Sequence, residues 1–248
     1  MRSLWPREHG AYAQLGAPLL ASLLLGEPTA PAIALAVGAC LAFLANEPLL
    51  VVLGHRGARL GAALGPAARR RLAITAGGAA IAAGVGLAFG PPLALALAAV
   101  AALPVLVMLR FAWTKSMHSV GGELLAAIAL PGAAAPVAAA AGIAWQTAAL
   151  LWVAWSLGYA ASVFAVHEVL RRQRRRLTGI LLVALALALA TVTALVPALG
   201  VSLPLAGISA LVCVRPPAAK RVRAIGVALA CASAASGVIA MLVAGATS

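Results

Sequence analysis

The stretch FLANEPLLVVLGHRGARLG, residues 43–61, decides the fold because it passes from an apolar run directly into a basic connection. An apolar run of about 20 residues is long enough to cross a bilayer as a helix. Arginines that follow such a run are typical of a connection on the cytoplasmic side of a membrane. The same transition recurs along the chain, so the sequence predicts an all-α integral membrane protein.

The composition supports this fold class and argues against a soluble one. Of the 248 residues, 64% are hydrophobic and 9% are charged, and the mean hydropathy is +1.07. A soluble domain of this length could not cover its core with so few polar side chains. The net charge of +13 does not indicate a nucleic-acid partner, because the basic residues lie between apolar segments. That pattern favours membrane topology and contact with anionic lipid headgroups.

Turn residues and basic clusters divide the chain into nine predicted transmembrane helices. Their predicted bounds are 10–26, 31–53, 72–89, 91–109, 121–141, 145–168, 177–197, 199–214 and 224–245. All 18 Lys and Arg precede the first helix or fall in every second connection, which predicts a cytoplasmic N-terminus and an outer C-terminus.

We expect a single membrane domain over residues 1–248. Helices 1–4 would occupy 10–109, helices 5–8 would occupy 121–214, and the ninth helix would occupy 224–245. Ala- and Gly-rich stretches such as PGAAAPVAAAAG, residues 131–142, predict surfaces where helices approach closely. The three cysteines lie in apolar runs without metal-type spacing, so we interpret them as packing residues.

Nearly all remaining ionisable residues fall at predicted cytoplasmic helix ends. These are the four histidines and four of the five glutamates, namely Glu8, His9, Glu47, His55, His118, Glu123, His167 and Glu168. The same boundaries carry basic residues, among them Arg56, Arg110, Lys115, Arg171 and Arg172. For single histidines such as His9, His55 and His118, the alternative to a functional role is an ordinary polar residue at a helix end.

Glu47 is harder to explain as a helix-end residue. At 1.5 Å per residue it lies about 10 Å inside the predicted end of its helix at Gly54. An acid at that depth costs about 2–3 kcal/mol unless it faces a partner or a wet cavity. Asn46 precedes it, and Pro48 removes a helical hydrogen bond and suggests a kink. The two readings are a functional cavity and a structural polar contact between helices.

Glu168 occupies a comparable place on the sixth predicted helix. If the two sets of four helices repeat, both acids face one central cavity. Glu47 and Glu168 would then bind a divalent cation or relay a proton. Basic residues around this cavity would bind a phosphorylated or carboxylated lipid headgroup.

Three segments carry a resemblance to a known family. REHGAYAQLGAPLL (residues 7–20), ANEPLLVVLGHRG (residues 45–57) and SVFAVHEVLRR (residues 162–172) resemble the YwiC-like family of bacterial membrane proteins. The resemblance covers most of the chain and implies a location in the bacterial inner membrane. It implies no particular activity.

The nine-helix layout also resembles the UbiA superfamily of intramembrane prenyltransferases. That resemblance implies two four-helix sets plus a ninth helix, and a prenyl diphosphate bound through Mg²⁺ at the cytoplasmic ends of helices 2 and 6. Asn46 and Glu47 match the first two positions of an N-D-x-x-D-x-x-x-D motif, with Glu for Asp. Leu50 and Gly54 stand where the later acids would be, and Glu168 represents the second motif.

Three functions remain open from the sequence. The first is a prenyl or lipid transferase acting on an isoprenoid diphosphate, in which Glu47, Glu168, His167 and His9 would be catalytic. The predicted substrate-binding residues are Asn46, Arg56, Arg110, Lys115, His118, Arg171 and Arg172, and the predicted Mg²⁺ ligands are Glu47 and Glu168. The second is a non-catalytic lipid- or cofactor-binding protein. The third is a small transporter, which a same-orientation repeat makes less natural.

Overall fold

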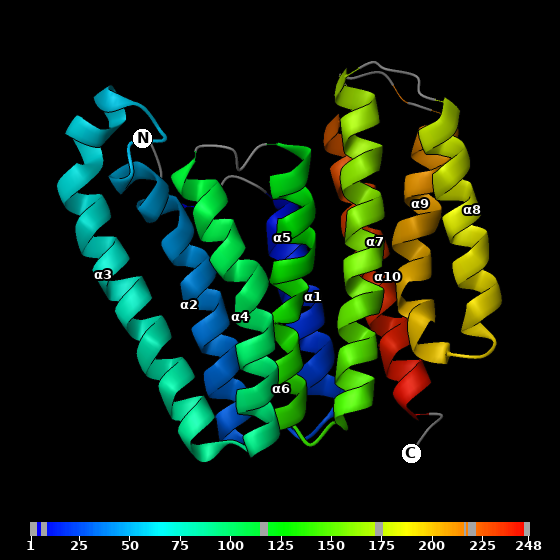
Figure 1. Ribbon diagram of the computed structural model, residues 1–248, viewed down its shortest axis with the longest axis horizontal. Helices are drawn as coiled ribbons and strands as arrows, with labels where there is room; N and C mark the ends of the chain where they lie inside the picture. Colours follow the sequence, from blue (N-terminus) through cyan, green and yellow to red (C-terminus); the bar gives the residue numbers. More distant parts are fainter. Residues whose placement is uncertain are drawn as a thin grey trace.

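The protein is a bundle of helices (Figure 1), and the computed structural model describes residues 4–5, 9–114, 119–171, 176–215, 217 and 222–245. Every regular element in these residues is helical. The elements are α1 His9–Leu25, α2 Ala30–Val52, α3 Ala58–Phe89, α4 Pro92–Trp113, α5 Val120–Gly132, α6 Ala134–Ala140, α7 Trp145–Arg171, α8 Arg176–Thr193, the 3₁₀ helix η1 Pro197–Ser202, α9 Leu203–Val214 and α10 Val222–Gly245.

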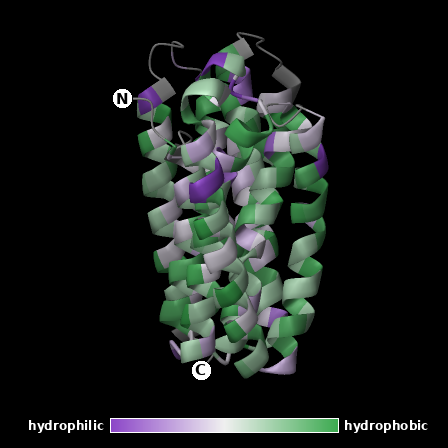
Figure 2. Cartoon of the chain, turned by 90° about the vertical axis from the view of Figure 1, so that its left-hand side faces the viewer, coloured by the Kyte–Doolittle hydropathy of each residue, from purple (hydrophilic) through white to green (hydrophobic). Residues whose placement is uncertain are grey.

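Seven of the described helical segments are long and apolar enough to cross a membrane. They are Ala30–Val52, Ala58–Phe89, Pro92–Trp113, Val120–Ala140, Trp145–Leu170, Pro197–Val214 and Arg223–Val243. Two shorter apolar helices, Gly10–Leu25 and Thr178–Thr193, accompany them. The prediction of an all-α membrane protein is therefore confirmed. Figure 2 shows hydrophobic residues over most of the bundle and hydrophilic ones gathered towards one end.

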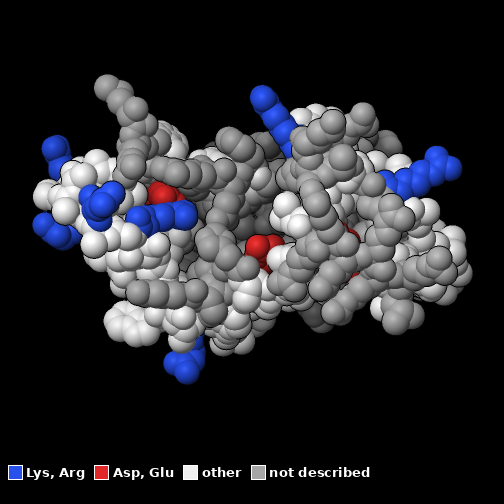
Figure 3. Space-filling model, turned by 90° about the horizontal axis from the view of Figure 1, so that it is seen from above, with Lys and Arg blue, Asp and Glu red and all other residues white. Residues whose placement is uncertain are grey.

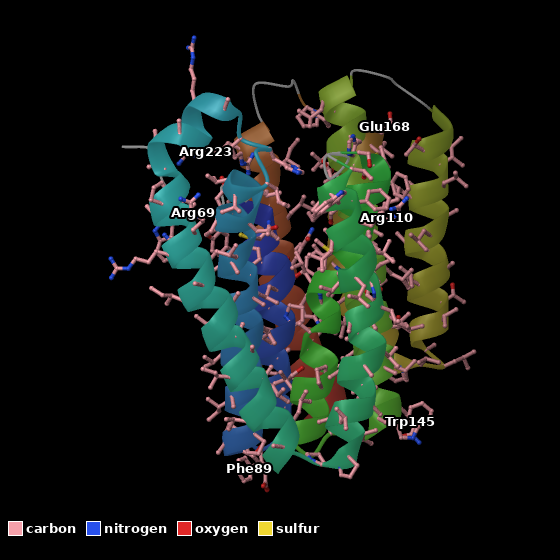
Figure 4. The ribbon with its side chains drawn as sticks, turned by 60° about the vertical axis from the view of Figure 1, so that its left-hand side comes forward. Arg69, Phe89, Arg110, Trp145, Glu168 and Arg223 are labelled. Carbon is pink, nitrogen blue, oxygen red and sulfur yellow. The ribbon has the colours of Figure 1, made fainter. Side chains whose placement is uncertain are left out.

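The helix ends that flank the basic connections lie together at one end of the bundle (Figure 1). This end, which we call the basic end, carries the C-terminal ends of α2, α4, α7 and α9 and the N-terminal ends of α3, α5, α8 and α10. The turns between α1 and α2, α3 and α4, and α6 and α7 lie at the other end. Figure 4 shows Glu168, Arg110 and Arg223 nearer the basic end, and Phe89 and Trp145 at the opposite end.

Two predicted boundaries are wrong because a helix continues into the basic sequence. Helix α3 begins at Ala58 rather than at residue 72, so Arg59 and the arginines at 69–71 lie on a helix instead of in a loop. Helix α4 runs to Trp113 and therefore includes Arg110 in its last turn. Arginine is a good helix former, so a charged segment outside the hydrocarbon layer need not unwind.

Close packing between small residues joins α2 to α3. A Cβ atom added at Gly38 would lie 3.1 Å from the backbone nitrogen of Ala83, and one at Gly86 would lie 2.6 Å from the side chain of Leu35. The two helices pack along their length because these positions lack side chains.

The Ala-rich segment predicted to be a contact surface is almost entirely buried. Helix α5 ends at Gly132, and α6 continues from Ala134 after a break next to Pro131 and Pro136. Proline cannot donate a hydrogen bond to the preceding turn, so these prolines interrupt the helical ladder at the break. Two side chains of other segments tie α6 in place at its first and last residues. Ser22 and Thr29 donate hydrogen bonds to the carbonyl oxygens of Ala134 and Ala140 at 3.3 and 2.8 Å.

The first and last helices meet and close the bundle. Helix α10 packs against α1, α9 and η1, while α7 packs against α5, α9 and η1. Tyr159 of α7 stacks on Trp155 with ring centroids 5.6 Å apart, and its hydroxyl donates to the carbonyl oxygen of Ala13 in α1 at 2.9 Å. The core therefore joins segments that are far apart in the sequence.

Candidate functional site: the polar side chains of the basic end

Glu47 is buried and held by one arginine. Only 2% of its side chain is exposed, and both carboxylate oxygens accept hydrogen bonds from Arg56. The Arg56 Nε to Glu47 Oε1 distance is 2.9 Å, and the Nη2 to Oε2 distance is 2.5 Å. A bidentate, charge-assisted pair of this kind is among the strongest polar contacts in proteins. The structure thus supplies the partner that an acid at this depth requires.

A short glycine turn brings Arg56 back to Glu47. Helix α2 continues through Pro48 and ends at Val52, where the His55 backbone nitrogen donates to the Leu50 carbonyl oxygen at 2.9 Å. Gly54 and Gly57 have φ angles of 78° and 86°, a region that glycine adopts without a steric penalty. The chain reverses between them, so Arg56 lies over the last turns of α2 rather than continuing away from the helix.

A second pair joins α5 to α7. The Nε2 atom of His167 lies 2.8 Å from Oε2 of Glu123, with 14% and 38% of the two side chains exposed. Glu123 lies in the first turn of α5, where Ser119 caps the helix by accepting a hydrogen bond from the Gly122 nitrogen at 3.1 Å. A carboxylate in this place fixes the orientation of the imidazole ring. The pair therefore ties the beginning of α5 to α7 at the basic end.

In the sequence, His167 is next to Glu168, and Glu123 follows His118 by five residues. Neighbouring residues on a helix point about 100° apart, so His167 and Glu168 do not share a direction. His167 points to α5, while Glu168 lies close enough to Cys213 of α9 for an electrostatic interaction. Among the described side chains, no hydrogen bond or ion pair joins Glu47 to Glu168.

The structure describes some of the other predicted site residues. Asn46 is half-buried on α2, and Arg110 is exposed in the last turn of α4. Lys115, His118 and Arg172, and the side chains of His9 and Arg171, lie outside the described residues. Their predicted roles stay predictions.

Figure 3 shows the basic end with described Arg side chains spread around its margin and acidic side chains further in. Among the described side chains, eight arginines but only three glutamates, Glu47, Glu123 and Glu168, lie towards this end. One of those acids is already paired with Arg56. The surface is consequently suited to an anion with several oxygen atoms.

The described residues do not fit the predicted Mg²⁺ site. They contain no group of three or more His, Cys, Asp or Glu side chains that could hold a metal ion. Both oxygens of Glu47 are occupied by Arg56. Mg²⁺ is normally held through carboxylate oxygens that remain accessible to it. We therefore assign no chemical step to a metal.

Comparison with known proteins identifies the family and nothing closer. No curated protein and no solved structure matches the chain. The model of the YwiC-like protein family matches residues 5–139. This region covers α1 to α6 and includes the Glu47–Arg56 pair and Glu123, whereas His167 lies beyond it. With more than half of its length matched, the chain belongs to the YwiC-like family.

Proposed function

We propose that this protein crosses the bacterial inner membrane nine times and binds an anionic lipid headgroup at its basic end. Seven long apolar segments support this proposal, and the two shorter apolar helices, α1 and α8, would bring the crossings to nine. The positive-inside rule would then put the basic end in the cytoplasm. The headgroup is a phosphate or carboxylate, carried by an isoprenoid or another lipid.

The excess of arginines over glutamates at the basic end carries this proposal. Glu47 is neutralised by Arg56, so it does not compensate the other cations. Arg110 is exposed at the end of α4. Lys115, Arg171 and Arg172 are predicted at the same end of the bundle, and with Arg110 they would form a basic rim. Arginine binds phosphate and carboxylate groups in a bidentate manner, which gives orientation as well as affinity.

Native mass spectrometry of the full-length protein in mild detergent tests the proposal. The wild-type protein should retain a lipid with an acidic headgroup, and Arg110→Ala should lose most of it. Arg59→Ala is the matched control, because Arg59 is also an exposed arginine at the basic end but lies in the first turn of the peripheral helix α3. Absence of bound lipid in the wild-type protein, or equal loss in both variants, would rule the proposal out.

The Glu123–His167 pair favours a second candidate function, transfer of a prenyl or lipid group. His167 would accept the proton that an acceptor hydroxyl loses when it attacks the prenyl carbon, and Glu123 would hold the ring in place. The diphosphate would leave as an anion towards the basic rim. This candidate predicts that purified protein converts labelled prenyl diphosphates in membrane extract, and that His167→Gln abolishes turnover without releasing bound substrate. Unchanged substrate in the wild-type reaction would rule out transfer, and lipid binding would then be the only remaining candidate function.

A further inference from the structure

Helix α3 is longer than a membrane crossing requires. Its 32 residues extend about 48 Å at 1.5 Å per residue, while the hydrocarbon core of a bilayer is about 30 Å thick. The buried positions of α3 include Leu60, Ala68 and Thr75, which face α2 at helical spacing. The opposite face is therefore free to contact lipid.

That lipid-facing side is an apolar stripe that ends in an arginine. Ile74, Ile81 and Phe89 expose 62%, 71% and 78% of their surface. With Arg70, which is also exposed, they fall within a 100° arc of the helix. Phe89 lies 19 residues after Arg70, a rise of about 28 Å, which is close to the hydrocarbon thickness. If Phe89 marks one boundary of the hydrocarbon layer, Arg70 lies at the other.

The neighbouring arginines are arranged as expected at the level of lipid headgroups. Nη1 of Arg69 lies 3.7 Å from where a Cβ of Gly65 would be, so this side chain runs towards the N-terminal end of α3, away from the apolar stripe. Long basic side chains at a membrane boundary extend in this direction to reach the headgroups. Arg71 packs over the ring of Trp5 at 4.5 Å, and tryptophan is enriched at membrane interfaces.

Neither Arg69 nor Arg70 forms an ion pair with a described residue. Two adjacent exposed cations at the boundary of an apolar stripe match one kind of partner, a lipid with an anionic headgroup and long acyl chains. The phosphate would lie against the guanidinium groups, and an acyl chain would follow Ile74 and Ile81.

We propose that the outer face of α3, formed by Arg69, Arg70, Ile74 and Ile81, is a binding surface for an anionic diacyl lipid of the surrounding bilayer. This surface is separate from the headgroup site proposed above. It requires only that α3 crosses a bilayer, and it does not depend on the rim residues Arg110 or Lys115.

Titration of the full-length protein with phosphatidylglycerol and with phosphatidylcholine, followed by native mass spectrometry, tests the surface. Each Arg near a charged membrane surface changes binding about fivefold, so Arg69→Gln with Arg70→Gln should weaken phosphatidylglycerol binding by about an order of magnitude or more. The control Arg59→Gln with Arg223→Gln removes the same charge from other exposed positions and should change binding less than about twofold. Phosphatidylcholine binding should stay unchanged in both.

A second variant separates lipid binding from simple anion binding. Ile74→Ser keeps every charge but removes an acyl contact, so it should also weaken phosphatidylglycerol binding, whereas Ile128→Ser on the exposed side of α5 should not. Excess inorganic phosphate should fail to displace the lipid. Equal weakening in the two double variants, no weakening in either, or displacement by inorganic phosphate would each overturn the proposal. Loss of the lipid from Arg110→Ala would concern only the headgroup site.

Discussion

At the residue scale, the Glu47–Arg56 pair explains why an acid lies inside an apolar helix. Glu47 is almost fully buried, while Arg56 keeps 24% of its side chain exposed. A buried carboxylate needs a charged partner or a metal ion, because an uncompensated charge in an apolar setting is strongly destabilising. Here the partner comes from a turn only nine residues later in the chain. The pair fixes the end of α2 to the beginning of α3.

Removal of Arg56 should therefore destabilise the protein strongly. We expect Arg56→Ala to lower the free energy of unfolding by about 3–5 kcal/mol, because Glu47 would be left buried without a partner. Arg59→Ala, which removes an exposed arginine of the next helix, should change it by less than about 0.5 kcal/mol. Denaturation in mixed detergent with increasing dodecyl sulfate measures both. A similar small effect for the two variants would show that Glu47 has another source of stabilisation.

Replacing both members of the pair separates its structural role from a functional one. Glu47→Leu combined with Arg56→Leu should recover most of the lost stability, since buried ion pairs are often replaceable by apolar residues of similar volume. If this stable double variant also retains the co-purifying lipid, the pair is structural only. Loss of the lipid from a stable double variant would place the pair in the binding site.

At the element scale, glycine positions determine how closely α2 and α3 pack. Their contact depends on Gly38 and Gly86, where an added Cβ would meet backbone or buried side-chain atoms. The break between α5 and α6 lies next to two prolines, and side chains of other segments donate hydrogen bonds to the first and last carbonyl groups of α6. Both features are built from residues that a hydropathy profile does not distinguish.

Two alanine substitutions on α3 test this packing. Gly86→Ala should destabilise the protein by about 1–3 kcal/mol, because the new Cβ would overlap the side chain of Leu35. Gly77→Ala is the matched control, since no atom lies within 4 Å of its added Cβ. Alanine favours helix over glycine, so the control should be neutral or stabilised by up to about 1 kcal/mol. Thermal melting in detergent, followed by size-exclusion chromatography, compares them. Equal behaviour of the two variants would contradict the close α2–α3 contact.

The difference between features that hydropathy marks and features that depend on packing explains what the sequence could and could not predict. The lengths of the apolar runs and the positions of the basic clusters predicted the helical segments, because both depend directly on whether a residue faces lipid or water. The start of α3 at Ala58 was missed because hydropathy marks the edge of the hydrocarbon layer, and the helix extends beyond that edge. The glycine pair around His55 and Arg56 was the available signal for the Glu47 partner. The Glu123–His167 contact has no local signal, because it depends on how α5 packs against α7.

At the scale of the whole molecule, the charge distribution is one-sided. The helix ends beside basic sequence lie together at one end of the bundle (Figure 1), and hydrophilic residues gather towards that end (Figure 2). This asymmetry is the property from which the positive-inside rule predicts a cytoplasmic N-terminus. It also gathers the described arginine side chains at one end of the bundle.

Cysteine labelling tests this orientation. In a variant whose three native cysteines are replaced by alanine, we place single cysteines at the exposed positions Glu27 and Arg59. A membrane-impermeant maleimide should label Glu27→Cys in bacteria whose outer membrane has been permeabilised. It should label Arg59→Cys only in inverted membrane vesicles. Labelling of both positions from the same side would contradict a crossing by α2, and the reverse pattern would invert the orientation.

Photocrosslinking with an anionic lipid carrying a reactive group near its phosphate tests the central claim most directly, because it reports where the headgroup binds. Peptides from the basic end, such as residues 103–114 and 119–124, should carry the crosslink, and an excess of unlabelled anionic lipid should compete with it. Crosslinks concentrated on the turns at the opposite end, or an identical pattern with a neutral lipid, would contradict binding of an anionic headgroup at the basic end.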